Sequence, residues 1–256
     1  MMQSCPITTK TILLFLMLFM SADMKAQSYN IGIGASVGTD GLGADVAALI
    51  TDYAAVRAGI SIWPKIGVKT NVHINDNNPL IADEVTLEGK PSIFDFKVLA
   101  DFYPINSSSF HITAGVFIGS SKFLTVTNTT MFIKDPQKYG KVGLTVGDYR
   151  LATDENGYIK AEVKSNSVKP YLGVGFGRAV PRKSRVSVSF DLGVQLWGKP
   201  ASYAWTKNDW DEREYHEIKY SDLDEYDDKH IKDALDFIEK IRVFPVLNVR
   251  LSGRLF

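Results

Sequence analysis

The residues best suited to catalysis or metal binding in this chain are its four histidines. They are His73, His111, His216 and His230, and none stands at a metal-binding spacing from another or beside a suitable nucleophile. A lipid hydrolase would need a nucleophile, a histidine base and an orienting acid that converge near a membrane surface. Only His111 is predicted to lie in a strand, near its end. We therefore predict no catalytic residue, no metal site and no cofactor, and expect a protein that is not an enzyme.

Two further stretches resemble binding motifs. The stretch 29–38, YNIGIGASVG, contains the G-x-G spacing of a phosphate-binding loop, but no helix pattern follows it. The turn at Asp154, Glu155, Asn156 and Gly157 resembles a cation-binding loop but lacks the EF-hand spacing. We interpret the first stretch as a strand and the second as an acidic, solvated turn.

Charged residues recur on one face of several segments that alternate between apolar and polar residues. This set, the predicted lumen charge network, consists of Asp45, Arg57, Asp95, Lys97, Asp101, Lys169, Asp191 and Arg250. Ionisable groups in a narrow interior must be paired or hydrated, and here the two signs balance. The pattern predicts a salt-bridged interior filled by side chains, and a narrow conductive pathway for small solutes is the alternative.

Eight segments could position these charges, because each alternates with the period of two that is typical of a β-strand. They are 29–38, 42–50, 54–62, 94–102, 110–119, 168–177, 186–196 and 243–256. In the fourth segment Phe94, Phe96 and Val98 share one face, and Asp95, Lys97 and Asp101 share the other. A soluble sandwich would have to cover that apolar face, and a soluble ligand-binding barrel would need a polar exterior. We therefore predict an all-β, transmembrane, up-and-down antiparallel barrel of about eight strands.

The connections also fit a membrane barrel, in which one end has short turns and the other has long loops. Short turns are predicted at Asp52, 104–109 and 181–184, and long external segments at 65–90, 122–166 and 198–242. The last of these contains one predicted helix, 222–240, which Ser221 can cap and whose Ile231 and Leu235 lie on one apolar stripe. This helix could pack over the barrel mouth or bind a partner.

The first 26 residues have the plan of a secretory signal peptide, with Lys10, an apolar core from Ile12 to Met20, and Ala26 before Gln27. We predict cleavage there, which leaves residues 27–256 as one barrel domain. The only cysteine, Cys5, lies in the predicted leader, so the mature chain forms no disulfide. A formal net charge of +0 gives no electrostatic case for nucleic acid.

The glycine-rich strands, the stretch LGVQLWGKP at 192–200 and the ending FPVLNVRLSGRLF resemble the outer-membrane β-barrel family common in Bacteroidota, small OmpX-like and OmpW-like barrels. The resemblance implies an up-and-down barrel in the outer membrane, in a family whose members are mostly of undefined task and in part porin-like. It also implies an ending similar to LSYRF, with Phe256 as the signal that the barrel assembly machinery reads. Because Gly253 replaces the aromatic residue and Leu255 intervenes, we expect a bulge or register shift near Ser252 and Gly253.

Together these patterns predict a monomeric outer-membrane barrel with a structural or surface-interaction role. Its expected partners are outer-membrane lipid, the barrel assembly machinery and a ligand or protein at the cell surface. A narrow porin-like channel is the main alternative, and an outer-membrane lipid hydrolase is a further one.

Overall fold

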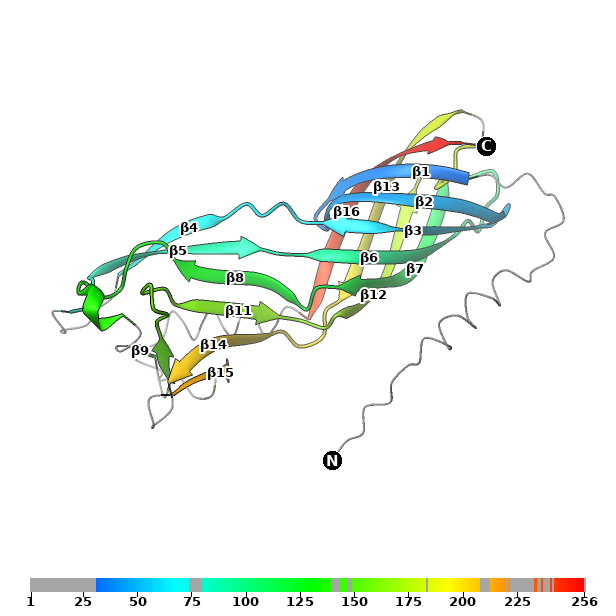
Figure 1. Ribbon diagram of the computed structural model, residues 1–256. Helices are drawn as coiled ribbons and strands as arrows, with labels where there is room; N and C mark the ends of the chain where they lie inside the picture. The colour runs from blue at the N-terminus through cyan, green and yellow to red at the C-terminus, as the bar shows by residue number, and fades with distance from the viewer. Residues whose placement is uncertain are drawn as a thin grey trace, which may run out of the picture.

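The computed structural model describes residues 31–73, 80–139, 143–146, 149–182, 184–207, 212–219, 221, 233, 236, 240 and 242–255. Eight strands close into one antiparallel barrel (Figure 1). They are β1 (Ile31–Gly38), β2 (Gly41–Thr51), β3 (Ala54–Ile62), β6 (Phe94–Phe102), β7 (Phe110–Gly119), β12 (Val168–Phe176), β13 (Val186–Leu196) and β16 (Val243–Arg254). Each pairs with its neighbours in chain order, and β16 pairs with β1. The all-β, up-and-down barrel of eight strands is therefore confirmed.

Side chains alternate between the outer wall and the interior of the barrel. On β6, Phe94, Phe96 and Val98 are 41%, 56% and 49% exposed, whereas Asp95 and Lys97 between them are buried. The other barrel strands add exposed apolar residues to the same wall, among them Ile33, Val46, Val56, Ile112, Leu172, Leu192 and Leu247. An apolar belt thus surrounds the barrel, and its polar residues face inward.

The closing strand β16 does not contain the bulge that we predicted near Ser252 and Gly253. Its pairing with β1 runs from Gly38 opposite Asn248 to Gly32 opposite Arg254 without a register shift. Gly253 lies in the ladder between Ile33 of β1 and Val186 of β13. The prediction was wrong because a strand paired on both sides accommodates a glycine without a bulge. Phe256 lies outside the described residues, so its role as an assembly signal stays a prediction.

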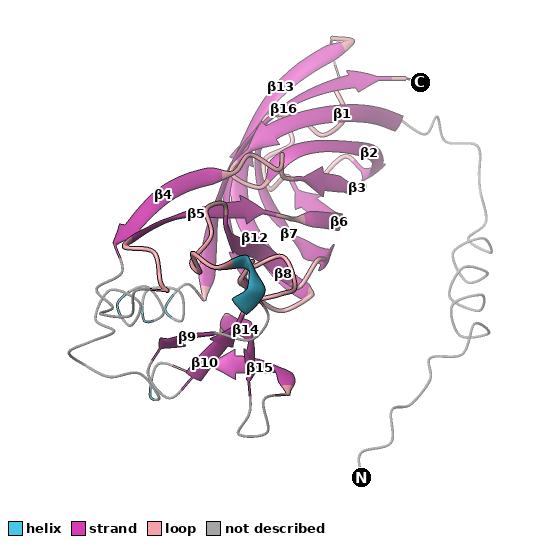
Figure 2. Cartoon of the chain, turned by 60° about the vertical axis from the view of Figure 1, so that its left-hand side comes forward, coloured by secondary structure: helices cyan, strands magenta, loops and turns pink. Residues whose placement is uncertain are grey.

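The three long connections form a second antiparallel sheet rather than irregular loops. Its strands are β4 (Val68–His73), β5 (Glu84–Pro91), β8 (Lys122–Asn128), β9 (Gly143–Val146), β10 (Tyr149–Ala152), β11 (Lys160–Lys164), β14 (Ala201–Lys207) and β15 (Arg213–Ile218). They pair in the order β4-β5-β8-β11-β14-β10-β9, with β15 on β14. The sheet projects from one end of the barrel, which we name the sheet end (Figures 1 and 2). The short connections β2–β3, β6–β7 and β12–β13 lie at the opposite end, the turn end, whereas the two-residue turn between β1 and β2 lies at the sheet end.

A small apolar core holds the second sheet together. It consists of Val85, Phe132, Ile133 and Ile159, all of them buried. Phe132 and Ile133 come from the connection after β8, which is fixed by an isolated bridge between Ile81 and Ile133 and ends in a short 3-10 turn, η1 (Pro136–Lys138). One face of the second sheet is therefore buried against the segment that follows β8.

Two predicted elements fall largely outside the described part of the chain. Residues 1–30 are not described, so the signal peptide and its boundary stay predictions. The structure gives no support to the helix predicted over 222–240, because most of those residues are also not described. Within the described residues, no helix is long and apolar enough to cross a membrane.

The core of the second sheet yields a test of its independence from the barrel. Phe132→Ala should cost about 3–5 kcal/mol locally, because it leaves a cavity beneath β5. Limited proteolysis should then cut the 80–139 region faster, while the folded barrel keeps its gel mobility. Val68→Ala is the matched control, since Val68 in the same sheet is 72% exposed. Equal protease resistance of both variants would contradict this account of the core.

Candidate functional site

The barrel interior is the candidate site, and three of its cations bind carboxylates directly. Lys169 Nζ lies 2.9 Å from both carboxylate oxygens of Asp95. Arg250 Nη2 donates to Asp45 Oδ1 at 2.5 Å, and its Nε contacts the same carboxylate at 2.9 and 3.0 Å. The third cation is Arg57, and all three cations are almost fully buried. Buried charges of opposite sign satisfy each other here as the desolvation cost requires.

Arg57, on β3, forms ion pairs with carboxylates on two other strands, β6 and β13. Its Nη2 atom lies 2.7 Å from Asp101 Oδ1, and its Nη1 atom lies 3.4 Å from Asp191 Oδ2. Thr113 donates to the same Asp101 oxygen at 2.7 Å. One guanidinium thereby bridges β3 to β6 and β13.

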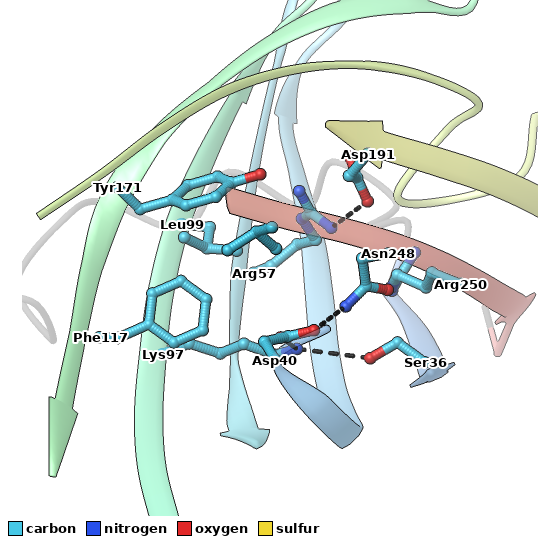
Figure 3. Close-up of a pocket in the computed structure, with 11 residues that line it drawn as sticks. Ser36, Asp40, Arg57, Lys97, Leu99, Phe117, Tyr171, Asp191, Asn248 and Arg250 are labelled. Atoms are coloured by element: carbon cyan, nitrogen blue, oxygen red, sulfur yellow. Dashed lines mark hydrogen bonds and ion pairs between the residues drawn. The ribbon is translucent and has the colours of Figure 1, made fainter. Parts of the chain in front are cut away.

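The fourth predicted cation, Lys97, has a partner that the sequence analysis did not identify. Its Nζ lies 3.9 Å from Asp40 Oδ2 and 3.4 Å from Ser36 Oγ. Asp40 lies in the turn between β1 and β2 but points back into the barrel, where Asn248 Nδ2 donates to it at 2.7 Å (Figure 3). Its sequence context is that of an ordinary turn aspartate, so no sequence signal distinguished it.

His111 also belongs to this network rather than to a catalytic or metal site. Its Nε2 lies 2.7 Å from Asp191 Oδ1, and its Nδ1 lies 3.2 Å from the Gly177 carbonyl oxygen. The Ser109 carbonyl oxygen lies 3.3 Å from the same Nδ1, so both ring nitrogens of His111 face oxygen atoms.

Glycines on the inner wall make room for these long side chains. A Cβ atom at Gly34 would collide with the guanidinium of Arg250, and one at Gly175 would collide with the His111 ring. Gly173 and Gly193 face the Tyr171 hydroxyl in the same way. The small inward residues of these strands are therefore the complement of the large charged ones.

Both ends of the interior are closed by packed side chains. At the turn end, Ala179 and Val180 enter the barrel mouth and pack on Ala47, Ala55 and Tyr103. Nearby, the Arg178 guanidinium lies 4.4 Å from the centre of the Tyr103 ring. At the sheet end, Trp197 stacks on Phe244 with ring centres 4.5 Å apart and contacts Phe123 at 4.7 Å. The charged layer thus lies between two apolar layers.

A cavity among the charged residues of the interior is small. It has a volume of about 10 Å³ and is lined by the charged network, including Arg57, Lys97 and Asp191. Arg57 Nε and Asn248 Oδ1 have no hydrogen-bond partner in the described part of the protein. A space of this size holds about one water molecule. Packed side chains surround this cavity.

The other predicted chemistry is dispersed. His216 Nε2 lies 2.8 Å from Glu214 in an exposed pair on β15, His73 lies in β4, and His230 is outside the described residues. Asp154 accepts from its own turn, from the backbone N–H groups of Asn156 and Tyr158. Among the described residues, no group of three His, Cys, Asp or Glu could hold a metal ion.

A second polar cluster lies on the outer face of the second sheet, and the sequence analysis missed it. We name it the lysine–tyrosine cluster: Lys122, Lys160, Glu162, Lys164, Tyr203 and Tyr215. Lys122 and Lys160 lie 3.1 and 3.0 Å from Glu162 Oε1, and Lys164 lies 4.0 Å from Glu162 Oε2. Only strand pairing brings β8, β11, β14 and β15 side by side, so no local sequence signal could have found it.

The protonation of Glu162 reflects these contacts. Partial burial acts to raise the pKa of Glu162, but hydrogen bonds from Lys160, Tyr215 and Lys122 outweigh it and lower the pKa to about 2. Burial and the hydrogen bond to Glu162 in turn raise the pKa of the Tyr215 phenol. Glu162 is therefore a stable carboxylate at neutral pH.

These features define a class: a closed eight-stranded antiparallel barrel with an apolar outer wall and a filled, charged interior. No protein-family model and no curated protein sequence matches the chain. Solved structures that are similar to it include that of Acinetobacter baumannii CarO2. For CarO2 the identity is 19% and the TM-score 0.49, over 90% of this chain and 100% of that one.

Two further similar structures have lower scores. A. baumannii CarO is 16% identical with a TM-score of 0.46, over 88% of this chain and 98% of that one. A major outer membrane protein from Thermus thermophilus is 14% identical with a TM-score of 0.45, over 90% of this chain and 100% of that one. At these values we transfer no function from them, and the barrel rests on the pairing of its own strands.

The buried pair of Lys169 and Asp95 yields the first test of the interior. Lys169→Met should lower stability by about 3–5 kcal/mol, because it leaves Asp95 buried without a partner. The double variant Lys169→Met/Asp95→Leu should recover most of that loss. Urea midpoints followed by gel mobility measure both effects. Lys90→Met, in an exposed pair, is the control, and a double variant less stable than either single variant would refute the pairing argument.

Glu162 yields a pH test. Because its folded pKa is below its ordinary value of 4.5, the ionised carboxylate stabilises the folded cluster above pH 4.5, and this contribution is lost as the pH falls toward about 2. The near-ultraviolet signal of Tyr215 and its neighbours should change across that window in the native protein. Glu162→Gln should lack this transition. A transition of the same size in both proteins would assign it to other groups.

Proposed function

We propose that the chain is an integral outer-membrane β-barrel with a filled lumen and a structural or surface-interaction role. The observation that carries the proposal is the inverted barrel: its exposed wall is apolar, and its interior is charged. An apolar outer wall is unfavourable in contact with water and favourable in contact with lipid. Closure of all eight strands leaves no open sheet edge in the hydrocarbon region.

The dimensions of the barrel support the same proposal. Its strands contain 8 to 12 residues, close to the roughly 9–11 tilted residues that cross a bilayer. The predicted signal peptide would deliver the chain to the envelope, and the C-terminal strand would be read by the barrel assembly machinery. We place both chain termini and the turn end in the periplasm. The second sheet then extends outside the cell, where it forms the working surface of a monomer.

A narrow channel for small solutes is the second candidate. The charged interior favours it, whereas the small cavity of about 10 Å³ among these charges and the packed layers at both ends oppose it. We expect planar bilayers containing the purified protein to show no discrete conductance. Conductance that changes in Asp95→Asn would favour the channel instead.

We propose no hydrolytic activity. Both ring nitrogens of His111 are directed at acceptors, which leaves neither to take a proton from a serine. Lipid hydrolysis by the purified protein that disappears in His111→Ala, with the barrel still folded, would reverse this proposal.

Membrane insertion itself can be tested on the outer wall. Leu192→Arg places a charge near the middle of β13, where lipid would make it cost about 2–4 kcal/mol. Vesicle-inserted protein should unfold at lower urea concentration, read from heat-modifiable gel mobility. Val68→Arg in the second sheet should change stability little. A native chain that stays soluble and monomeric without detergent would overturn the proposed function.

A further inference from the structure

The lysine–tyrosine cluster carries a surplus of positive charge. Three lysines, Lys122, Lys160 and Lys164, surround the single carboxylate of Glu162, and they are 39%, 48% and 32% exposed. On the adjoining β15 strand, Arg213 and Glu217 alternate with Tyr215 on one face and offset each other in charge, whereas Glu214 pairs with His216. Three ammonium groups against one carboxylate leave two positive charges that no described carboxylate of the cluster neutralises.

Aromatic rings hold Lys164 in place, and the Glu162 carboxylate holds Lys122 and Lys160. Lys164 Nζ lies 4.7 Å from the centre of the Tyr203 ring and 4.6 Å from that of Tyr215. The two rings stack with their centres 5.4 Å apart, and Tyr215 donates a hydrogen bond to Glu162 at 2.8 Å. The ammonium groups are therefore already ordered, so a ligand would lose little of its binding free energy in ordering them.

The cluster lies just beyond the apolar wall of the barrel. Lys122 follows the end of β7 at Gly119 by three residues, and Lys164 precedes the start of β12 at Val168 by four. At about 3.3 Å per residue on tilted strands, Lys122 and Lys164 lie on the order of 10 Å above the wall. Lys160 precedes Val168 by eight residues and reaches back from farther out to the Glu162 oxygen that Lys122 also contacts. Headgroups occupy roughly 5–8 Å on each side of the hydrocarbon, and lysines extend toward them.

The side chains also face outward rather than into the barrel. Phe123, next to Lys122, contacts Trp197 over the barrel interior. Val163, between Glu162 and Lys164, is buried on the inner face of the sheet. Strand alternation therefore directs Lys122, Glu162 and Lys164 to the outer face, on the side where the membrane surface would lie.

We propose that the lysine–tyrosine cluster binds the phosphate-bearing headgroup of a lipid in the outer leaflet. A phosphate monoester carries about −1.5 to −2 charges at neutral pH, which matches the surplus of the cluster. Because the site needs a membrane beside it, this inference rests on the proposed function. It gives the second sheet a defined contact with the lipid surface, in addition to its connections to the barrel.

The test uses the full chain in an uncharged detergent, with the bisphosphorylated glycolipid lipid A and its dephosphorylated form as probes. Lys122→Gln/Lys160→Gln/Lys164→Gln should weaken lipid A binding roughly 100-fold, since each lysine near a lipid phosphate contributes about a fivefold factor. The matched control is Lys69→Gln/Lys134→Gln/Lys138→Gln, which removes the same charge elsewhere on the extension and should bind as the native chain does. Dephosphorylated lipid A should bind the native chain as weakly as lipid A binds the cluster variant.

Each other outcome has a defined meaning. If lipid A binding weakens equally in the two triple variants, the effect comes from the net charge of the protein, and the proposed site is overturned. Displacement of lipid A by inorganic phosphate alone would make it a site for free phosphate and overturn the lipid proposal. Heat-modifiable mobility is measured for every variant. If the barrel is folded but the cluster variant binds lipid A as tightly as the native chain does, only this inference is refuted. A native chain that stays soluble and monomeric without detergent refutes the proposed function.

Discussion

Closure of the sheet between β16 and β1 is the constraint on which the rest of the structure depends. An open edge would leave a row of backbone N–H and C=O groups without partners, and pairing of the first and last barrel strands removes it. Once eight strands close, the interior is only wide enough for side chains. Each inward residue must then fit against those from the opposite wall, and the outer wall becomes apolar by the same alternation.

That narrow interior explains why the charges pair as they do. Arg250 and Asp45 come from neighbouring walls around β1, and Gly34 between them leaves the space that the guanidinium occupies. Arg57 bridges two carboxylates, and His111 contacts the second of them. The network is buried between the apolar layers at the two ends, and burial raises the cost of any unpaired member. Under the proposed function, a filled barrel of this kind is a support rather than a conduit.

The second sheet extends this support beyond the barrel. Because β5, β8, β11 and β14 adjoin barrel strands directly in the chain, the pairing of the wall continues into the extension. Its inner face has its own apolar core around Val85 and Phe132, and its outer face carries the lysine–tyrosine cluster. The position of the cluster just above the apolar belt is a consequence of this continuity.

The sequence by itself determined the eight barrel strands, their order and the inward position of the eight predicted charges, because period-two alternation is a local property that survives folding. It did not determine which charges meet. Asp40 lies in a turn that resembles any other, and His111 and Asn248 joined the network only when distant strands closed around them. The second sheet and the lysine–tyrosine cluster were decided by long-range pairing among short, weakly alternating segments. The closing strand β16 is a further example. The sequence predicted a bulge at Gly253, but pairing with strands on both sides keeps β16 regular there.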